Sequence, residues 1–282
     1  MKTKIFLDSG DPAETKQTLD LLGYLDGQTT NPSLIVKHPD AQARFQSGQK
    51  FSQQEILDFY KKVIQQISAI IPAGSVSVEV YADAQTTAQT MIEQAREMNQ
   101  WIPNAWIKLP TTSEGLKAAH ELSQEGMRLN LTLCFSQEQA AAVYAATKGA
   151  GKGDIFVSPF IGRLDDRGEN GMDLIANIVK MYQAGDGHVE VLTASVRNQD
   201  HFLEALRLQT DIITAPLKAI QPWAEAGQKV PGNDYIYPKG ALSSIPYQEI
   251  SLDQDWSAYN IQHDLTDKGL EKFASDWNAL IG

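Results

Sequence analysis

The sequence predicts a (β/α)8 barrel, a closed sheet of eight parallel strands surrounded by helices. Short apolar runs alternate with longer segments of helical periodicity over roughly 220 residues, and such alternation produces a parallel sheet. Eight units of this kind are the number that closes a barrel. An open, doubly wound sheet is the alternative, but no GxGxxG motif follows the first strand, which argues against a dinucleotide-binding version.

Eight short apolar segments are predicted as strands because they are bounded by turn residues and too short for buried helices. The clearest is 75–81, in which valines alternate with other residues. The predicted strands are 4–8, 27–30, 75–81, 105–109, 127–133, 154–157, 189–193 and 212–214. The strand at 27–30 runs directly into Asn31, and the proline after Asn31 predicts an extended or turn conformation there.

The segments between these strands carry apolar residues at the three- and four-residue spacing of amphipathic helices. Tyr60, Val63 and Ile67, for example, would share one helix face. Asp83 is predicted to cap the helix after the third strand. The predicted helices are 12–22, 52–71, 83–98, 113–122, 136–146, 172–184, 198–206 and 217–220.

We expect one domain over residues 1–282, including two segments outside the eight-unit pattern. Residues 222–263 are rich in Pro, Gly, Tyr and Trp and lack periodicity, and a loop of that length is usually functional or mobile. Residues 265–281 are amphipathic and predict a C-terminal helix lying on the barrel. Its aromatic residues, Phe273 and Trp277, are more typical of packing than of a substrate lid.

Composition argues against several classes of partner. The net charge of −11 repels nucleic acid and anionic membranes, and no apolar stretch approaches the roughly 20 residues that span a bilayer. The single cysteine, Cys134, excludes an internal disulfide and suits a reducing cytoplasm, where we expect the protein. No histidines stand at metal-ligand spacing, so we expect no catalytic metal. Barrel enzymes often associate, so a homo-oligomer is left open.

Polar residues stand where the predicted strands end. In a (β/α)8 barrel, the C-terminal ends of the strands form the active site. The residues at or just after these ends are Asp8, Asn31, Glu79, Lys108, Asn130, Thr132, Ser158, Ser195, Arg197 and Thr214. A barrel with a purely structural role has no need of so many.

Lys108 is the most informative of these residues because it lies within an apolar strand. If Ile107 and Leu109 point outward, the pleat turns Lys108 into the barrel. Burial of an amine disfavours its charged form, and a neutral amine is the nucleophile that carbonyl chemistry needs. The alternative is a lysine at the strand end that points to solvent or pairs with a carboxylate.

Two further groups of residues carry hypotheses of their own. Asp8 and Glu79 could act as a general acid and base; the alternative is that each carboxylate is simply salt-bridged. Arg163 and Arg197 each follow a serine after a late strand, which is the composition of a phosphate-binding site. The alternative is that both arginines are ordinary surface residues.

Seven sequence blocks near these strand ends resemble those of the transaldolase family. They occur in family order and span roughly three quarters of the chain. The blocks are FLDSGDP (6–12), TTNPSLI (29–35), SVEVYAD (77–83), WIKLPTTSEGLKA (106–118), LNLTLCFS (129–136), VSPFIGRLDD (157–166) and LTASVRN (192–198). Each block alone is a weak signal, but the set is highly specific.

The resemblance implies a cofactor-independent mechanism in which Lys108 forms a Schiff base with a ketose phosphate. Asp8 would serve as general acid and base. Glu79 and Thr132 would hold a water molecule that relays protons. The residues implied to bind the sugar phosphate are Asn31, Asn130 and Ser158 at the dihydroxyacetone unit, Phe160 beside the imine, and Arg163, Ser195 and Arg197 at the phosphate.

Within the family, Glu79 and Phe160 are similar to the transaldolase type, whereas fructose 6-phosphate aldolases carry Gln and Tyr at these positions. The implied reaction transfers dihydroxyacetone from sedoheptulose 7-phosphate or fructose 6-phosphate to glyceraldehyde 3-phosphate or erythrose 4-phosphate, in the non-oxidative pentose phosphate pathway. Three alternatives stay open: a fructose 6-phosphate aldolase, a transaldolase acting on a sulfonated sugar, and a non-catalytic barrel that binds sugar phosphates.

Overall fold

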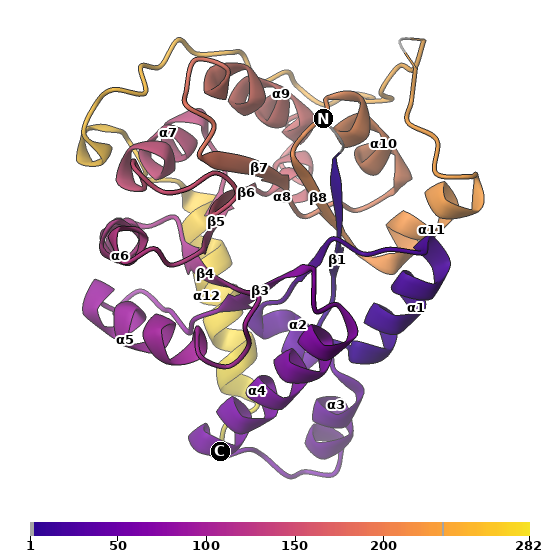
Figure 1. The fold of residues 1–282 in the computed structure, drawn as a ribbon, viewed down its shortest axis with the longest axis vertical. Coiled ribbons are helices and arrows are strands. Elements are labelled where there is room, and N and C mark those ends of the chain that lie inside the picture. Colours follow the sequence, from indigo (N-terminus) through magenta and orange to yellow (C-terminus); the bar gives the residue numbers. More distant parts are fainter. Residues whose placement is uncertain (1–2, 233) are drawn as a thin grey trace.

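The computed structural model describes residues 3–232 and 234–282, and its eight strands form a closed barrel with the neighbours in sequence order. All pairings are parallel, including that of the last strand with the first, so the predicted (β/α)8 barrel is confirmed (Figure 1). The strands are β1 (Lys4–Asp8), β2 (Gly27–Thr29), β3 (Ser75–Glu79), β4 (Ala105–Pro110), β5 (Leu129–Cys134), β6 (Ile155–Pro159), β7 (Val189–Thr193) and β8 (Ile212–Ala215).

Helices surround the barrel, and most of them begin at a side-chain cap. The longest, α4, starts with a capping box between Ser52 and Glu55. The helices are α1 (Pro12–Leu22), α2 (Pro32–Val36), α3 (Pro39–Gln46), α4 (Gln53–Ile70), α5 (Ala88–Met98), α6 (Ser113–Gln124), α7 (Gln137–Ala146), α8 (Ile161–Asp165), α9 (Gly171–Tyr182), α10 (Gln199–Arg207), α11 (Leu217–Glu225) and α12 (Asp264–Ala279), with a 3₁₀ turn, η1, at Trp256–Ala258. None of the helices in the described ranges is long and apolar enough to cross a membrane.

One predicted helix start was wrong. Asp83 does not cap α5, because its carboxylate accepts hydrogen bonds from Gln85 and Thr86 within a preceding turn. Thr87 caps the helix instead, accepting from the backbone N–H of Thr90. Asp, Ser and Thr all serve in turns as well as in caps, so the first such residue in a loop is not always the cap.

Three short helices, α2, α3 and α8, were not predicted. The first two begin with proline directly after a capping side chain, Asn31 and His38 respectively. Each has eight residues or fewer, which is too short for an apolar periodicity to be recognised.

The segment predicted as irregular from residue 222 begins later than expected, because α11 continues through Pro222 to Glu225. The chain that follows passes along the outer side of α9 and α7 before it reaches α12 (Figure 1). The Gln137 side chain makes two hydrogen bonds with the backbone of Gln248, and Ser243 bonds to the backbone beyond α8. The segment therefore lacks regular structure but is attached to the barrel at several points.

The interior of the barrel is layered. Phe156 contacts both Phe6 and Trp106 near its N-terminal end, with the rings of Trp106 and Phe156 stacked at 5.3 Å. Because side chains alternate along a strand, the residues two positions onward face the same interior. These are Asp8, Lys108 and Ser158, so polar groups form the layer nearest the C-terminal end.

Candidate active site

A cavity of about 290 Å³ opens at the C-terminal end of the barrel. Of the residues predicted for the site, it is lined by Asp8, Asn31, Lys108, Ser158, Phe160, Arg163, Ser195 and Arg197. The other three, Glu79, Asn130 and Thr132, are buried in the adjoining strand ends. We call the part around Asp8, Glu79 and Lys108 the inner end of the cavity. The part around Arg163, Ser195 and Arg197 is its arginine end.

Lys108 occupies the inner end with its side chain only 3% exposed. The strand register places it between Glu79 on β3 and Asn130 on β5. Its Nζ atom lies 2.8 Å from Oε2 of Glu79 and donates a hydrogen bond to the carbonyl oxygen of Thr30 at 3.3 Å. The predicted inward orientation is confirmed. Lys108 also pairs with a carboxylate, that of Glu79, so the inward orientation and the ion pair, considered as alternatives from the sequence, occur together.

The two carboxylates of the inner end have raised pKa values. Burial raises the pKa of Glu79, and the positive charge of Lys108 opposes this shift without cancelling it. Burial likewise raises the pKa of Asp8, against the charge of Lys108 and a hydrogen bond from the Thr29 hydroxyl to Oδ1 at 2.6 Å. Carboxyl groups with raised pKa values next to a buried amine are suited to accepting and returning protons.

A chain of hydrogen bonds supports the opposite wall of the inner end. The Ser158 hydroxyl donates to Oδ1 of Asn130 at 2.6 Å, and Nδ2 of Asn130 donates to the Ser77 hydroxyl at 3.0 Å. These bonds fix which end of the Asn130 amide faces Ser158. Thr132 is buried, and its hydroxyl makes no hydrogen bond with any described residue.

The arginine end is built from α8 and from the loop after β7. Arg163, on α8, has no carboxylate partner among the described residues. Burial lowers its pKa, and the nearby charge of Arg197 lowers it further. Arg197 is more exposed and forms a two-point ion pair with Asp166, the shorter contact being 2.7 Å. Two neighbouring guanidinium groups, one of them unpaired, make this end suited to an anion.

Helix α12 covers part of the cavity and adds residues that the sequence did not identify. The ring of Phe273 lies 5.9 Å from both Nζ of Lys108 and the guanidinium of Arg163, so it is close to both ends of the cavity. Phe273 is buried, as expected for packing, but it also lines the cavity. Lys272 and Asp276 line the same side and pair with each other.

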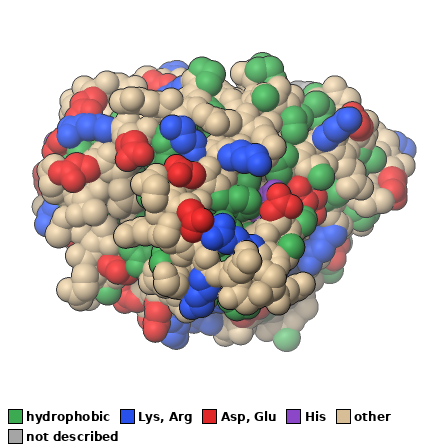
Figure 2. Space-filling view, turned by 90° about the horizontal axis from the view of Figure 1, so that it is seen from below, with side chains coloured by type: hydrophobic (Ala, Val, Ile, Leu, Met, Phe, Trp, Pro, Cys, Tyr) green, Lys and Arg blue, Asp and Glu red, His purple; other side chains and the backbone are tan. Residues whose placement is uncertain are grey.

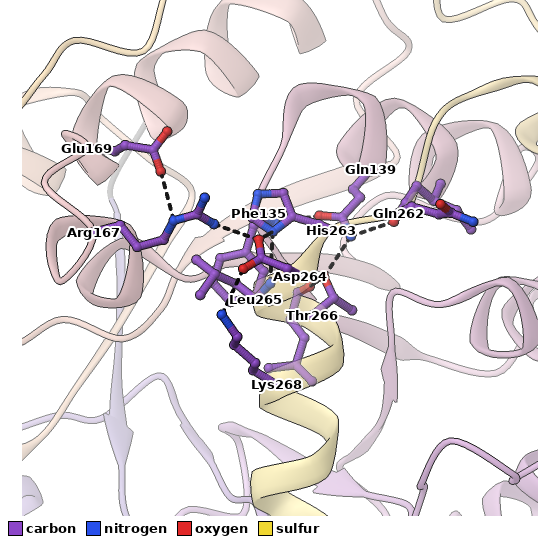
Figure 3. A network of polar contacts seen from close by, with 12 residues as sticks. Phe135, Gln139, Arg167, Glu169, Gln262, His263, Asp264, Leu265, Thr266 and Lys268 are labelled. Carbon is purple, nitrogen blue, oxygen red and sulfur yellow. Dashed lines mark hydrogen bonds and ion pairs between the residues drawn. The ribbon is translucent and has the colours of Figure 1, made fainter.

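The N-terminal end of α12 is fixed to the barrel by a polar network (Figure 3). The His263 ring caps the helix and stacks on Phe135 with centroids 5.3 Å apart. Arg167 lies between Glu169 and Asp264, with its contact to Asp264 at 2.7 Å. This anchoring holds α12, and with it Phe273, in a defined position over the barrel mouth.

The local charge of the cavity differs from that of the whole chain. The protein carries a net charge of −11, yet Lys and Arg side chains are interspersed with Asp and Glu on the face seen in Figure 2. Long-range attraction of an anion is therefore weak, and the arginine end must supply it locally. Across residues 3–232 and 234–282, no group of three or more His, Cys, Asp or Glu side chains is arranged to hold a metal ion.

Comparison with known proteins agrees with these features. The model of the transaldolase/fructose-6-phosphate aldolase family matches residues 5–282. A "Probable transaldolase" of Dehalococcoides mccartyi is 35% identical over 277 residues, covering 98% of this chain and 99% of that protein. Another, from Cereibacter sphaeroides, is 38% identical over 274 residues, covering 97% and 95%.

Among solved structures, the 3-hexulose-6-phosphate synthase of Salmonella typhimurium superposes with a TM-score of 0.50 at 12% identity, covering 80% of this chain and 94% of that one. This likeness concerns the barrel alone. The family match and the relatives extend over nearly the whole chain. The chain therefore belongs to the transaldolase/fructose-6-phosphate aldolase family.

Proposed function

We propose that the protein is a transaldolase that transfers a dihydroxyacetone unit from a ketose phosphate to an aldose phosphate through a Schiff base on Lys108. The observation that carries the proposal is the position of Lys108: a buried amine lies beside two carboxylates at one end of a cavity whose other end holds two arginines. Family membership favours the same chemistry.

In the first step, the amine of Lys108 attacks the ketone carbon, and water leaves as the iminium forms. Glu79 and the free hydroxyl of Thr132 face this region and would hold the water that relays the protons. The positive iminium then accepts the electron pair of the breaking C–C bond. Glu79, which pairs with Lys108 in the free protein, remains close enough to balance that charge.

Asp8 takes the proton from the hydroxyl group on the carbon that becomes the aldehyde. Its raised pKa and its fixed contact with Thr29 suit it to accept this proton and to return it later. The departing aldehyde leaves an enamine on Lys108. The enamine attacks the acceptor aldehyde, Asp8 protonates the new alkoxide, and water hydrolyses the iminium to release the product.

The remaining residues would hold the substrate across the cavity. Asn31, Asn130 and Ser158 provide amide and hydroxyl groups for the hydroxyls of the dihydroxyacetone unit. Arg163, Ser195 and Arg197 would bind the phosphate. Phe160 and Phe273 shield the enamine side of the cavity from water, which favours transfer to an aldehyde over release.

The test is reductive trapping. The protein is incubated with fructose 6-phosphate and reduced with borohydride, and the modified peptide is mapped by mass spectrometry, with Lys108→Arg as the control. We expect a substrate-derived adduct on Lys108 that is absent from the variant. Native protein that binds the substrate but leaves Lys108 unmodified would overturn the proposal and favour a non-catalytic binding protein.

A second measurement separates the two activities of the family. With fructose 6-phosphate and erythrose 4-phosphate together, a transaldolase forms the transfer product faster than it releases free dihydroxyacetone. Faster release than transfer would assign the protein as a fructose 6-phosphate aldolase. The alternative of a transaldolase acting on a sulfonated sugar is tested by replacing the ketose phosphate with the corresponding ketose sulfonate in the same assay.

A further inference from the structure

A single buried histidine joins the two segments that carry the arginines. His201 lies on α10 and is 3% exposed. Its Nε2 atom lies 2.7 Å from Oδ2 of Asp165, the last residue of the helix that carries Arg163. Its Nδ1 atom accepts a hydrogen bond from the backbone N–H of Arg197 at 3.3 Å. These partners assign the ring proton to Nε2, which donates to Asp165.

Both ends of this connection are held by the backbone. The second oxygen of Asp165 accepts a hydrogen bond from the backbone N–H of Gly171 at 2.9 Å, at the start of α9. The backbone N–H of His201 donates to the capping side chain of Asn198 at 2.9 Å. The imidazole ring, carried by α10, therefore connects the end of α8 with the loop that carries Arg197.

The loop that carries Arg197 needs such support. Ser195 adopts a left-handed backbone conformation, with φ at 58°, which is unfavourable for a residue with a side chain and persists only where contacts hold it. The loop also packs directly on α8: a Cβ atom added to Gly162 would lie 2.4 Å from Nε of Arg197 and 2.6 Å from the carbonyl oxygen of Ser195. A small shift of the loop would therefore change how far apart the two guanidinium groups lie.

Electrostatic repulsion adds to this requirement. Arg163 and Arg197 carry like charges that act on each other. Arg197 pairs directly with Asp166, whereas Arg163 makes no ion pair among the described residues and feels Asp166 and Asp276 only at longer range. Repulsion between the two guanidinium groups favours separation of α8 from the loop that carries Arg197. A fixed connection between the segments opposes that separation.

We propose that His201 is a positioning residue: together with Asp165 it sets the spacing of Arg163 and Arg197 so that both reach the same anionic group of the substrate. This inference rests on the proposed function only for the identity of that anion as a sugar phosphate. His201 does not touch the substrate itself. Its effect is on the affinity for the charged group and not on the carbonyl chemistry at Lys108.

The test uses variants that break the same bond from either side. His201→Asn keeps an acceptor where Nδ1 stood and removes the donor to Asp165; Asp165→Ala removes the acceptor. A matched control exists in His188→Asn, since His188 is also buried and paired with an aspartate, Asp186, at 2.5 Å, but its hydrogen bonds go to neither of the segments that carry the arginines. Thermal unfolding of each variant shows whether it is folded.

Binding of inorganic phosphate is measured by calorimetry, and kinetics are compared for phosphorylated and unphosphorylated acceptor aldehydes. We call the His201–Asp165 hydrogen bond the bridge, and His201→Asn and Asp165→Ala the bridge variants. Each bridge variant should weaken phosphate binding roughly tenfold, the value of one hydrogen bond to a charged group. The double variant should bind phosphate no more weakly than either single variant, because both changes break the same bond. KM for the phosphorylated acceptor should rise in parallel, with kcat and the uncharged acceptor nearly unchanged. His188→Asn should bind phosphate as the wild type does.

Unchanged phosphate affinity in folded bridge variants would overturn the inference, and so would additive losses in the double variant, an equal loss in His188→Asn, or no phosphate binding by the wild type. These results are separate from the trapping experiment. If Lys108 is not trapped but the bridge variants still lose phosphate affinity, the proposed function fails and the bridge stands. If Lys108 is trapped and phosphate affinity is unchanged, only the bridge fails.

Discussion

The inner end of the cavity and its arginine end hold charged groups by different means. Lys108 and Glu79 are 3% and 5% exposed and are carried by adjacent strands in fixed register. Arg197 and Asp166 are 47% and 60% exposed. Arg197 lies in a loop, and Asp166 directly follows the short helix α8. At the inner end, the reactive atoms have little freedom to move. At the arginine end, the exposed Arg197–Asp166 ion pair can be broken so that Arg197 binds a ligand instead.

The two kinds of construction imply different consequences of mutation. A buried ion pair in register has no water to replace a missing partner, so its loss affects the reacting atoms directly. A half-exposed pair is screened by solvent and contributes little to folding. If the proposed function holds, changes at the inner end should reduce turnover, and changes at the arginine end should reduce affinity.

The largest effect is expected for Asp8→Asn. Removing a general acid and base typically lowers the rate by about 10²–10⁴-fold, and the isosteric amide keeps an acceptor for the Thr29 hydroxyl. We expect kcat for transfer to fall within that range while KM for the ketose phosphate changes little. Steady-state kinetics measure both, and borohydride trapping on Lys108 should persist. Loss of trapping would instead give Asp8 a role in forming the imine.

At the arginine end, Arg163→Gln should raise KM more than Arg197→Gln does. Arg163 makes no ion pair among the described residues, although Asp166 and Asp276 act on it at longer range, so its guanidinium can bind the anion without giving up a direct partner. Arg197 must first give up Asp166, which offsets part of its contribution. We expect losses of about 2–3 kcal/mol and about 1 kcal/mol, respectively, in kcat/KM for phosphorylated substrates.

Unphosphorylated aldehydes are the control for this pair of variants. Both arginine variants should handle them nearly as the wild type does, because no charged group is lost. Equal losses for charged and uncharged substrates would show that the arginines support the fold and do not bind the anion.

The inner end was the part of the site that the sequence predicted best. Strand alternation and the pleat predicted that Lys108 points into the barrel, and the observed register puts Glu79 and Asn130, two of the predicted strand-end residues, on either side of it. These relations follow from the regular geometry of parallel strands. The family blocks then indicated the remaining lining residues, all of which lie at or next to the cavity.

The arginine end and the cover of the cavity were harder to predict because they depend on contacts between distant segments. Phe273 reaches the cavity only because α12 packs across the barrel mouth, and helical periodicity shows which face is apolar but not what it covers. His201 and Asp165 are 36 residues apart and gave no local signal. The short helix α8 lacked the length for a periodic pattern.

A moderate effect is expected for Phe160→Tyr, which tests how the side chain in the cavity wall influences the enamine. The Phe160 ring is buried at the cavity wall, 5.8 Å from the ring of Phe135. A tyrosine hydroxyl there would bring a proton donor close to the enamine, favouring release of dihydroxyacetone over transfer. We expect the ratio of release to transfer, measured by product analysis, to rise several-fold. An unchanged ratio would exclude residue 160 as the determinant of reaction type.

The smallest expected effect is that of Asp8→Asn on the stability of the fold. This substitution should lower activity but raise the free energy of unfolding. Because burial raises the pKa of Asp8 in the folded protein, its carboxylate is less favourable there than in the unfolded chain. This cost is present in full above the folded-state pKa and disappears as the pH falls below the unfolded-state value. Asp8→Asn should therefore raise the free energy of unfolding at pH 8, and the gain should shrink toward pH 4.

Denaturant unfolding at both pH values measures this difference, with Asp166→Asn as the control from the arginine end. Its ion pair is half-exposed, so its removal should change the free energy of unfolding by less than about 0.5 kcal/mol at either pH. If Asp8→Asn were less stable than the wild type at pH 8, the contacts of Asp8 with Lys108 and Thr29 would outweigh its burial. The inner end would then be stabilised by the same charges that make it reactive.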